Sequence, residues 1–162
     1  MNWKPKKEVS DKQLLNDLCK FAAYQERCVS DIEKKLDQYD ISEDDKNGMI
    51  DYLIEERFLD EDRFVEMYVK GRFNLKKWGK IKIKSHLRNK RIPSSKIEKG
   101  LRFINEAQYI KVLFGLGQKK WDSLEKEEPV QRKVKTLRFL ASKGYESDKI
   151  YSFLDSVTKG AL

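Results

Sequence analysis

The residues best placed for chemistry in this 162-residue chain are thirteen lysines and arginines between Lys70 and Arg102. Only one acid, Glu98, lies among them, so this window carries a charge of +12, whereas the whole chain carries +8. The other 129 residues therefore sum to −4. Apolar side chains such as Trp78 and Ile83 are interleaved with the charges. A basic block of this kind is typical of a surface that binds phosphates or an acidic partner.

A helix over about residues 80–90 would arrange many of these cations in stripes. Lysines and arginines at steps of three and four residues repel one another by some tenths of a kcal/mol per pair, and almost no acid offsets them. This repulsion favours an external anion over the alternative, a solvated helix whose long side chains cover the core. One stripe holds Lys80, Lys84, Arg88 and Arg91, and a second holds Lys82, His86 and Lys90.

Two neighbouring features leave alternatives open. The stretch Asp40–Glu66 has eleven acids against three basic residues, a charge of −8. It either balances the basic block within the molecule or forms a surface that faces a basic protein partner. Trp78, beside Gly79, either stacks on a base or fills the gap at an inter-helix turn, and we favour the packing role.

The sequence gives no support for catalysis. His86 is the only histidine, it stands among cations, and no Ser or Cys is placed to use it as a base, so we interpret it as a surface residue. Gly115-Leu-Gly117 lacks the rest of a dinucleotide fingerprint, and no phosphate loop is present. Cys19 and Cys28 have neither disulfide nor zinc spacing and are expected to be small buried thiols. We therefore predict no enzyme activity, no cofactor and no metal.

The composition indicates a folded helical protein. The chain is 38% charged and 39% hydrophobic, with a mean hydropathy of −0.78, yet its apolar residues recur at helical spacing nearly throughout. No stretch approaches the roughly 20 apolar residues of a membrane span, and the N-terminus lacks the apolar core of a secretory signal. These patterns predict an all-α protein in the cytoplasm, without membrane contact.

Helix starts are marked by residues that can accept hydrogen bonds from unpaired backbone N–H groups. Ser42–Asp45 is a capping-box pattern, and Asp60 can cap a helix beginning at residue 61. Pro93–Ser95 and Ser147–Asp148 are expected to open two further helices in the same manner.

The helical stripes form an internal repeat with a period near 50 residues. Ile32 and Leu36 correspond to Ile83 and Leu87, shifted by 51, and a similar correspondence shifted by 53 leads into the last third of the chain. Three helical stripes per period predict three tandem three-helix repeats, packed on one another as an elongated, curved array. The predicted division is a flexible basic tail at 1–10, repeats at 11–58, 59–105 and 106–162, and a mobile connector from Gly117 to Pro129.

Four segments of the middle third resemble the central motif of the RecX family. They are Phe58-Leu-Asp-Glu-Asp-Arg-Phe64, Lys77-Trp-Gly-Lys80, Ile83-Lys-Ser-His-Leu87 and Lys90-Arg-Ile-Pro93. One departure is Arg91, which stands where the family usually has the glycine of a Lys-Gly-Ile turn. The resemblance is strong over this third and extends through the repeat layout over about residues 22–156.

The resemblance implies a non-enzymatic regulator of the RecA recombinase. RecX proteins bind in the groove of the RecA–DNA filament and inhibit its ATPase, strand exchange and coprotease functions, so the chain is expected to modulate DNA repair and the SOS response. The expected partners are RecA and the RecA–DNA filament, with DNA itself as a further candidate, and the chain is expected to be a monomer. Candidate contact residues are Arg72, Lys76, Lys77, Lys80, Lys84, Arg88 and Arg91. The family motif residues, candidates for the fold or the partner, are Asp60, Asp62, Arg63, Phe64, Trp78 and Gly79.

A second hypothesis is a helical protein that binds nucleic acid by itself. Phosphate contacts alone would then carry the affinity, which would fall steeply with salt and need no RecA. No residue is singled out for reading a base edge, so sequence-specific recognition is not predicted.

Overall fold

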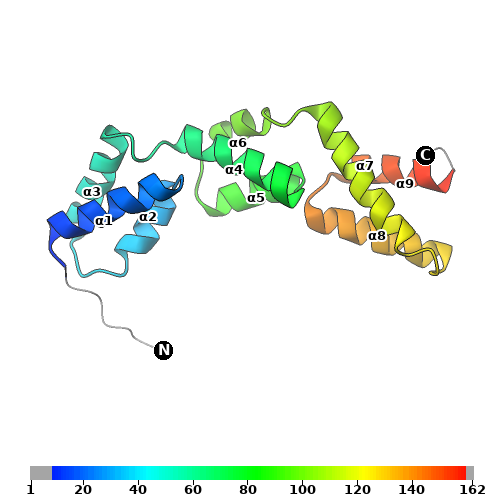
Figure 1. The fold of residues 1–162 in the computed structure, drawn as a ribbon, viewed down its shortest axis with the longest axis horizontal. Helices are drawn as coiled ribbons and strands as arrows, with labels where there is room; N and C mark the ends of the chain where they lie inside the picture. Colours follow the sequence, from blue (N-terminus) through cyan, green and yellow to red (C-terminus); the bar gives the residue numbers. More distant parts are fainter. Residues whose placement is uncertain (1–8, 160–162) are drawn as a thin grey trace.

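The computed structural model describes residues 9–159, which form nine α-helices. The helices follow one another in three groups of three along the longest axis of the molecule (Figure 1). The first unit comprises α1 (Asp11–Tyr24), α2 (Val29–Leu36) and α3 (Glu43–Glu55). The second comprises α4 (Glu61–Lys76), α5 (Lys80–Asn89) and α6 (Ser94–Leu101). The third comprises α7 (Glu106–Asp122), α8 (Pro129–Lys143) and α9 (Ser147–Thr158).

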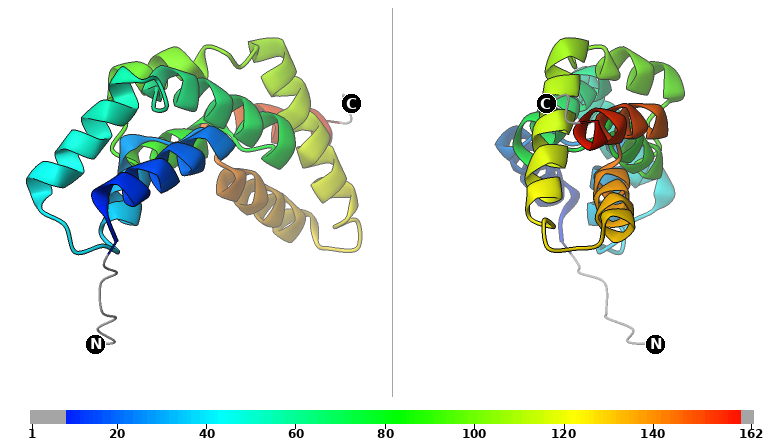
Figure 2. Two further views of the ribbon diagram at one scale, coloured as in Figure 1. Left: turned by 60° about the vertical axis from the view of Figure 1, so that its left-hand side comes forward. Right: turned by 90° about the vertical axis from the view of Figure 1, so that its right-hand side faces the viewer.

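The prediction of an all-α, elongated and curved array of three-helix repeats is confirmed. Seen from the side, the row of units bends into an arch (Figure 2). Residues 1–8, most of the tail expected at 1–10, lie outside the described residues, as do residues 160–162. No helix in the described part of the chain is long and apolar enough to cross a membrane.

The apolar side chains gather in two separate cores. The first core belongs to the first unit, where residues such as Leu14, Leu18 and Ile32 are fully buried at helical spacing. The second core runs through both the second and third units and includes Val69, Ile83 and Leu113, among many others. The second and third units are therefore held together as one hydrophobic body, whereas the first is a body of its own.

The junction between the second and third units is made largely of backbone. The Gly79 N–H donates to the Lys143 carbonyl at 2.8 Å, and the Ile81 N–H donates to the Gly144 carbonyl at 3.0 Å. A Cβ atom at Gly79 would lie 2.1 Å from the Gly144 carbonyl oxygen, so only glycine fits this approach. The Tyr145 hydroxyl adds a hydrogen bond to the Lys77 carbonyl at 3.1 Å.

The first and second units meet mainly through ion pairs instead, and Cys28 is the one buried side chain that the first unit adds to the second core among the described residues. Arg63 Nε binds Glu26 at 2.6 Å, and Lys90 Nζ binds Asp31 at 2.6 Å. Arg91 pairs with Glu33 across the same junction. The pKa of Asp31 is lowered, because burial opposes ionisation but the hydrogen bonds from Lys90 and Cys28 outweigh it.

Two of the four predicted helix starts have the expected cap, and two do not. The Ser42 hydroxyl accepts from the Asp45 N–H at 3.1 Å, and the Asp60 carboxylate accepts from the Arg63 N–H at 3.0 Å. At α6 and α9 the cap positions are Pro93 and Glu146, neither of which makes a side-chain cap, so the prediction of serine caps there was wrong. The serines at these two sites are the first helical residues.

The prediction of a mobile connector from Gly117 to Pro129 was wrong for residues 117–122, which are helical. Helix α7 continues to Asp122, and only the turns that follow separate it from Pro129. Gly117 is buried inside this helix, where a Cβ atom would lie 2.6 Å from the Phe153 ring. The glycine thus serves close packing of α7 on α9 rather than a break in the helix.

Candidate binding surface

The predicted contact residues Arg72, Lys76 and Lys77 lie together at the C-terminal end of α4. Lys77 ends the helix in the left-handed conformation, with φ of 55°, and turns the chain sharply toward α5. Lys76 and Lys77 are exposed, and Arg72 is half-buried. No carboxylate in residues 9–159 forms an ion pair with any of these three cations, so their charge is available to an external anion.

Trp78 forms the centre of a cluster of aromatic and basic side chains. The Arg72 guanidinium lies 5.1 Å from its ring centroid, and Lys82 Nζ lies 4.8 Å from it. His86 packs on the ring with centroids 4.6 Å apart, and Arg72 also lies over the Tyr68 ring at 4.8 Å. Cations over aromatic faces are held in place while their charge stays exposed. We call Tyr68, Arg72, Trp78, Lys82 and His86 the Trp78 cluster.

The Trp78 side chain is half-buried and packs against the core of the second and third units. The packing role favoured from the sequence therefore describes one part of the side chain. The cations of the Trp78 cluster contact the ring, so the tryptophan also positions Arg72 and Lys82. Both residues lack an ion-pair partner within the described chain, although Lys82 Nζ donates to the Ser142 carbonyl at 3.0 Å.

The remaining predicted contact residues are mostly neutralised within the molecule. Lys80 Nζ binds Glu106 at 2.5 Å, Lys84 pairs with Glu98, and Arg91 pairs with Glu33. Arg88 is exposed and forms no ion pair within residues 9–159. Three of the four cations at positions 80, 84, 88 and 91 are thus already paired within the molecule at its surface, Arg88 is not, and Arg91 lies beyond the end of α5.

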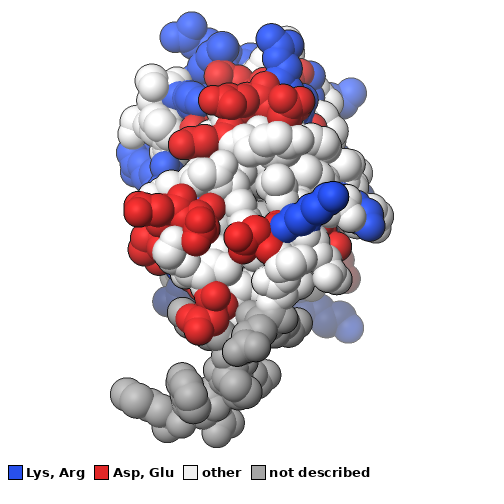
Figure 3. All heavy atoms as spheres, turned by 90° about the vertical axis from the view of Figure 1, so that its left-hand side faces the viewer, with Lys and Arg blue, Asp and Glu red and all other residues white. Residues whose placement is uncertain are grey.

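The acidic stretch partly balances the basic unit, as one of the two interpretations expected. Lys96 binds Glu61 at 3.1 Å, and Lys99 binds Asp62 at 3.1 Å. Other acids of this stretch, such as Asp51 and Glu55, are exposed and form no ion pair in the described part of the chain. Carboxylates gather in several groups on the end of the molecule formed by the first unit (Figure 3).

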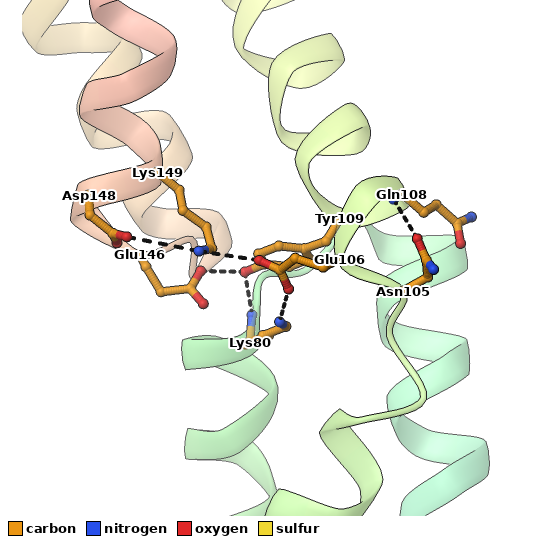
Figure 4. A network of polar contacts seen from close by, with 8 residues as sticks. All are labelled: Lys80, Asn105, Glu106, Gln108, Tyr109, Glu146, Asp148 and Lys149. Atoms are coloured by element: carbon orange, nitrogen blue, oxygen red, sulfur yellow. Dashed lines mark hydrogen bonds and ion pairs between the residues drawn. The ribbon is translucent and has the colours of Figure 1, made fainter.

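Lys80 anchors a polar network between the second and third units (Figure 4). Its backbone N–H donates to the Tyr109 hydroxyl at 2.9 Å, and this hydroxyl donates to Glu146 at 2.6 Å. Glu106 accepts a hydrogen bond from Lys80 Nζ and forms an ion pair with Lys149 Nζ at 3.3 Å. The hydrogen bond from Lys80 lowers the pKa of Glu106, whereas burial and the neighbouring Glu146 raise the pKa of Tyr109.

The family motif residues have clear structural roles. Asp60 caps α4, and its pKa is lowered chiefly by the Arg63 N–H that it accepts. Arg63 bridges to Glu26 and donates to the Arg57 carbonyl at 3.1 Å, and Phe64 is buried. These residues, with Asp62, Trp78 and Gly79, position the second unit against its neighbours.

The sequence-based choice of contact residues omitted Lys82, His86 and Tyr68. The signal for the first two was present, because Lys82 and His86 are spaced by four residues and so share one side of α5, and Trp78 precedes Lys82 by the same interval. Tyr68 precedes Arg72 by the same interval on α4. The choice followed the longer stripe of lysines and arginines, and the carboxylate partners of three of its members are remote in the sequence.

The fold and the surface define a class: an arched array of three-helix units with a basic, aromatic-rich middle. A family model described as "RecX, second three-helix domain" matches residues 60–101, and "RecX, third three-helix domain" matches residues 106–154. Together the two matches cover more than half of the chain. The chain belongs to the RecX family.

Curated relatives and solved structures agree with this assignment. "Regulatory protein RecX" of Clostridium acetobutylicum is 30% identical over 169 residues, covering 94% of this chain and 78% of the relative. That of Clostridium tetani is 36% identical over 111 residues, covering 67% of this chain and 50% of the relative. The chain spans 50–60% of the length of the first three curated relatives that it matches.

Two crystal structures share the fold. The first, of regulatory protein RecX, superposes with a TM-score of 0.80 at 22% identity and covers 95% of this chain and 81% of its own. The second, of RecX from Lactobacillus salivarius, has a TM-score of 0.80 at 23% identity and covers 91% of this chain and 96% of its own.

Proposed function

We propose that the chain is a non-enzymatic regulator that binds the RecA–DNA filament and inhibits its ATPase, strand exchange and coprotease activities. It acts in the cytoplasm by stoichiometric binding and so modulates recombination and the SOS response. The observation that carries this proposal is the Trp78 cluster at the middle of an arched array, where Arg72 and Lys82 have no carboxylate partner among residues 9–159. An elongated array can follow a helical groove and contact more than one protomer.

The Trp78 cluster distinguishes this surface from an ordinary lysine-rich helix. Arg72 and Lys82 each lie over the Trp78 ring, which restrains them, so less side-chain freedom is lost when an anion binds. The paired cations Lys84 and Lys99 are already satisfied by Glu98 and Asp62. Binding energy for a phosphate or carboxylate should therefore concentrate at the Trp78 cluster and not along the whole basic unit.

The decisive measurement is the ATPase rate of RecA on single-stranded DNA, titrated with the chain. We expect inhibition at stoichiometric amounts, and at least a tenfold higher concentration for half-inhibition by the double variant Arg72→Ala/Lys82→Ala. The matched control removes the same charge at paired positions, Lys84→Ala/Lys99→Ala, and should stay within about twofold of the wild type. An unmodified chain without effect on the ATPase would refute the proposal.

A second candidate is a nucleic-acid binder that needs no RecA. It is favoured by the half-buried Trp78 beside Arg72 and Lys82, since an aromatic face with cations also suits single-stranded nucleic acid. The two candidate functions differ in whether binding to nucleic acid requires RecA. Tight binding to a labelled oligonucleotide without RecA, falling steeply with salt, would support the second.

A further inference from the structure

A groove of about 520 Å³ lies between the end of α1 and the outer side of α4. Its wall on α4 runs from Phe64 to Lys76 at steps of three and four residues, which is one continuous stripe of the helix. The opposite side of α4 carries Val65, Val69 and Phe73, all buried in the core. Helix α4 therefore has a second, partly apolar stripe, in which Phe64 is buried and Met67 and Leu75 are exposed.

The groove holds the two most exposed large apolar side chains of the described residues, Tyr24 at 87% and Leu75 at 81%. Met67, also in its lining, is 58% exposed. Single exposed apolar residues are ordinary, but three in one concave surface indicate a site where another molecule binds. Methionine side chains such as that of Met67 are common at surfaces that bind apolar side chains of a partner protein.

The form of the groove suits a helix. The stripe from residue 64 to residue 76 covers about three turns, roughly 18 Å at 1.5 Å per residue. Gly71 lies at its middle, and a Cβ atom there would contact nothing within 4 Å, so a second backbone can approach closely. A helical stripe facing solvent is complementary to the ridge of another helix.

The charge of the groove lining indicates the charge of the partner that binds there. Arg72 and Lys76 line it without an ion-pair partner in the described chain. The one acid in the lining, Glu26, is already bound to Arg63 at 2.6 Å. A bound segment therefore meets net positive charge and gains from carboxylates along its edge.

We propose that this groove binds an amphipathic helix of a partner protein, with apolar residues against Tyr24, Met67 and Leu75 and acidic residues against Arg72 and Lys76. Tyr24 and Tyr68 in the lining have flat faces, but Met67 and Leu75 do not, so a helix with apolar side chains fits this part of the groove better than stacked bases of single-stranded nucleic acid. The inference goes beyond the filament proposal, since it concerns a surface on the first and second units that any such helix can occupy.

The test uses the full chain and two labelled peptides of about four helical turns. Both carry leucines at i, i+3, i+4 and i+7, but one has glutamates along one edge and the other has lysines. In fluorescence anisotropy, we expect the acidic peptide to bind at least tenfold more tightly than the basic one. Leu75→Asp and Gly71→Trp should each weaken this binding tenfold or more, the first by charge in the apolar floor and the second by filling the groove.

A matched control is Val130→Asp, which places the same acid on a 72% exposed apolar residue outside the groove. It should bind the acidic peptide within twofold of the wild type, and circular dichroism should show unchanged helix content in all three variants. Equal affinity for both peptides, no binding by the wild type, or binding unaffected by Leu75→Asp and Gly71→Trp would each overturn the proposal.

Two further readouts separate the possible occupants. Binding of a labelled oligonucleotide that Leu75→Asp abolishes would reassign the groove to nucleic acid. Self-association in sedimentation that Leu75→Asp abolishes would reassign it to a second copy of the chain. Peptide binding and RecA ATPase inhibition are independent measurements. A chain that binds the acidic peptide but does not inhibit RecA would support the proposed helix-binding groove and refute the filament proposal.

Discussion

At the scale of single residues, Arg91 shows how a local conformation is kept without the residue that favours it. Its φ is 61°, in the left-handed region that glycine adopts without strain. The ion pair with Glu33 across the first junction gives the arginine a role that glycine could not supply.

Substitutions at Arg91 should separate the conformational cost from the ion pair. Arg91→Ala and Arg91→Gly both remove the ion pair, but only glycine relieves the left-handed backbone. We expect Arg91→Gly to be more stable than Arg91→Ala by about 1 kcal/mol. Urea denaturation of both variants checks this difference, and equal midpoints would show that the turn relaxes when the side chain is shortened.

At the scale of elements, Glu106 at the start of α7 ties this helix to the second unit and to α9 of its own unit. It binds Lys80 of α5 and Lys149 of α9. Its pKa in the folded protein lies below the ordinary value of 4.5, so the interaction stabilises the fold at pH values above 4.5. This stabilisation is lost as the pH falls through the lowered pKa, when the carboxylate becomes protonated.

Glu106→Gln should therefore have a pH-dependent effect on stability. Because the Glu106 side chain is 56% exposed, we expect the variant to lose only about 0.5–1 kcal/mol at pH 7. At pH 3 the loss should shrink as the wild-type carboxylate takes up its proton. Denaturation curves at the two pH values measure this difference, and a loss of equal size at both would contradict an ionic role.

The sequence predicted features of the helices that depend on near neighbours. The burial of Leu14 and Leu18 follows from their helical spacing, and the Ser42 cap lies three residues from its donor. The partners of the basic stripe could not be predicted in this way, since Lys80 finds its carboxylate 26 residues later. Helix α7 likewise continues through Gly117 because Phe153, from a remote helix, packs on it.

At the scale of the whole molecule, the two cores predict two bodies that unfold independently. The first unit has its own core and joins the second mainly through ion pairs, with Cys28 as its one side chain in the second core among the described residues. The second and third units share a continuous core. Elements that share a core open together, and separate cores can open separately.

Core truncations should show this division. Ile32→Ala and Leu113→Ala each remove a fully buried side chain and should cost about 2–5 kcal/mol. In hydrogen exchange followed by mass spectrometry, Ile32→Ala should speed exchange in α1, α2 and α3 only. Leu113→Ala should speed it across both the second and third units, α4 to α9. Faster exchange in α7 to α9 upon Ile32→Ala would contradict separate cores.

The close approach of Gly79 to Gly144 has a consequence for how such a chain can change over generations. A side chain at Gly79 would collide with the Gly144 backbone, and one at Gly144 would collide with the backbone of Lys82. Because the obstacles are main-chain atoms, no second substitution nearby can make room for either. We expect the two positions to be inherited together as glycines. The angle between the second and third units should therefore vary less among descendants than the angle between the first and second units.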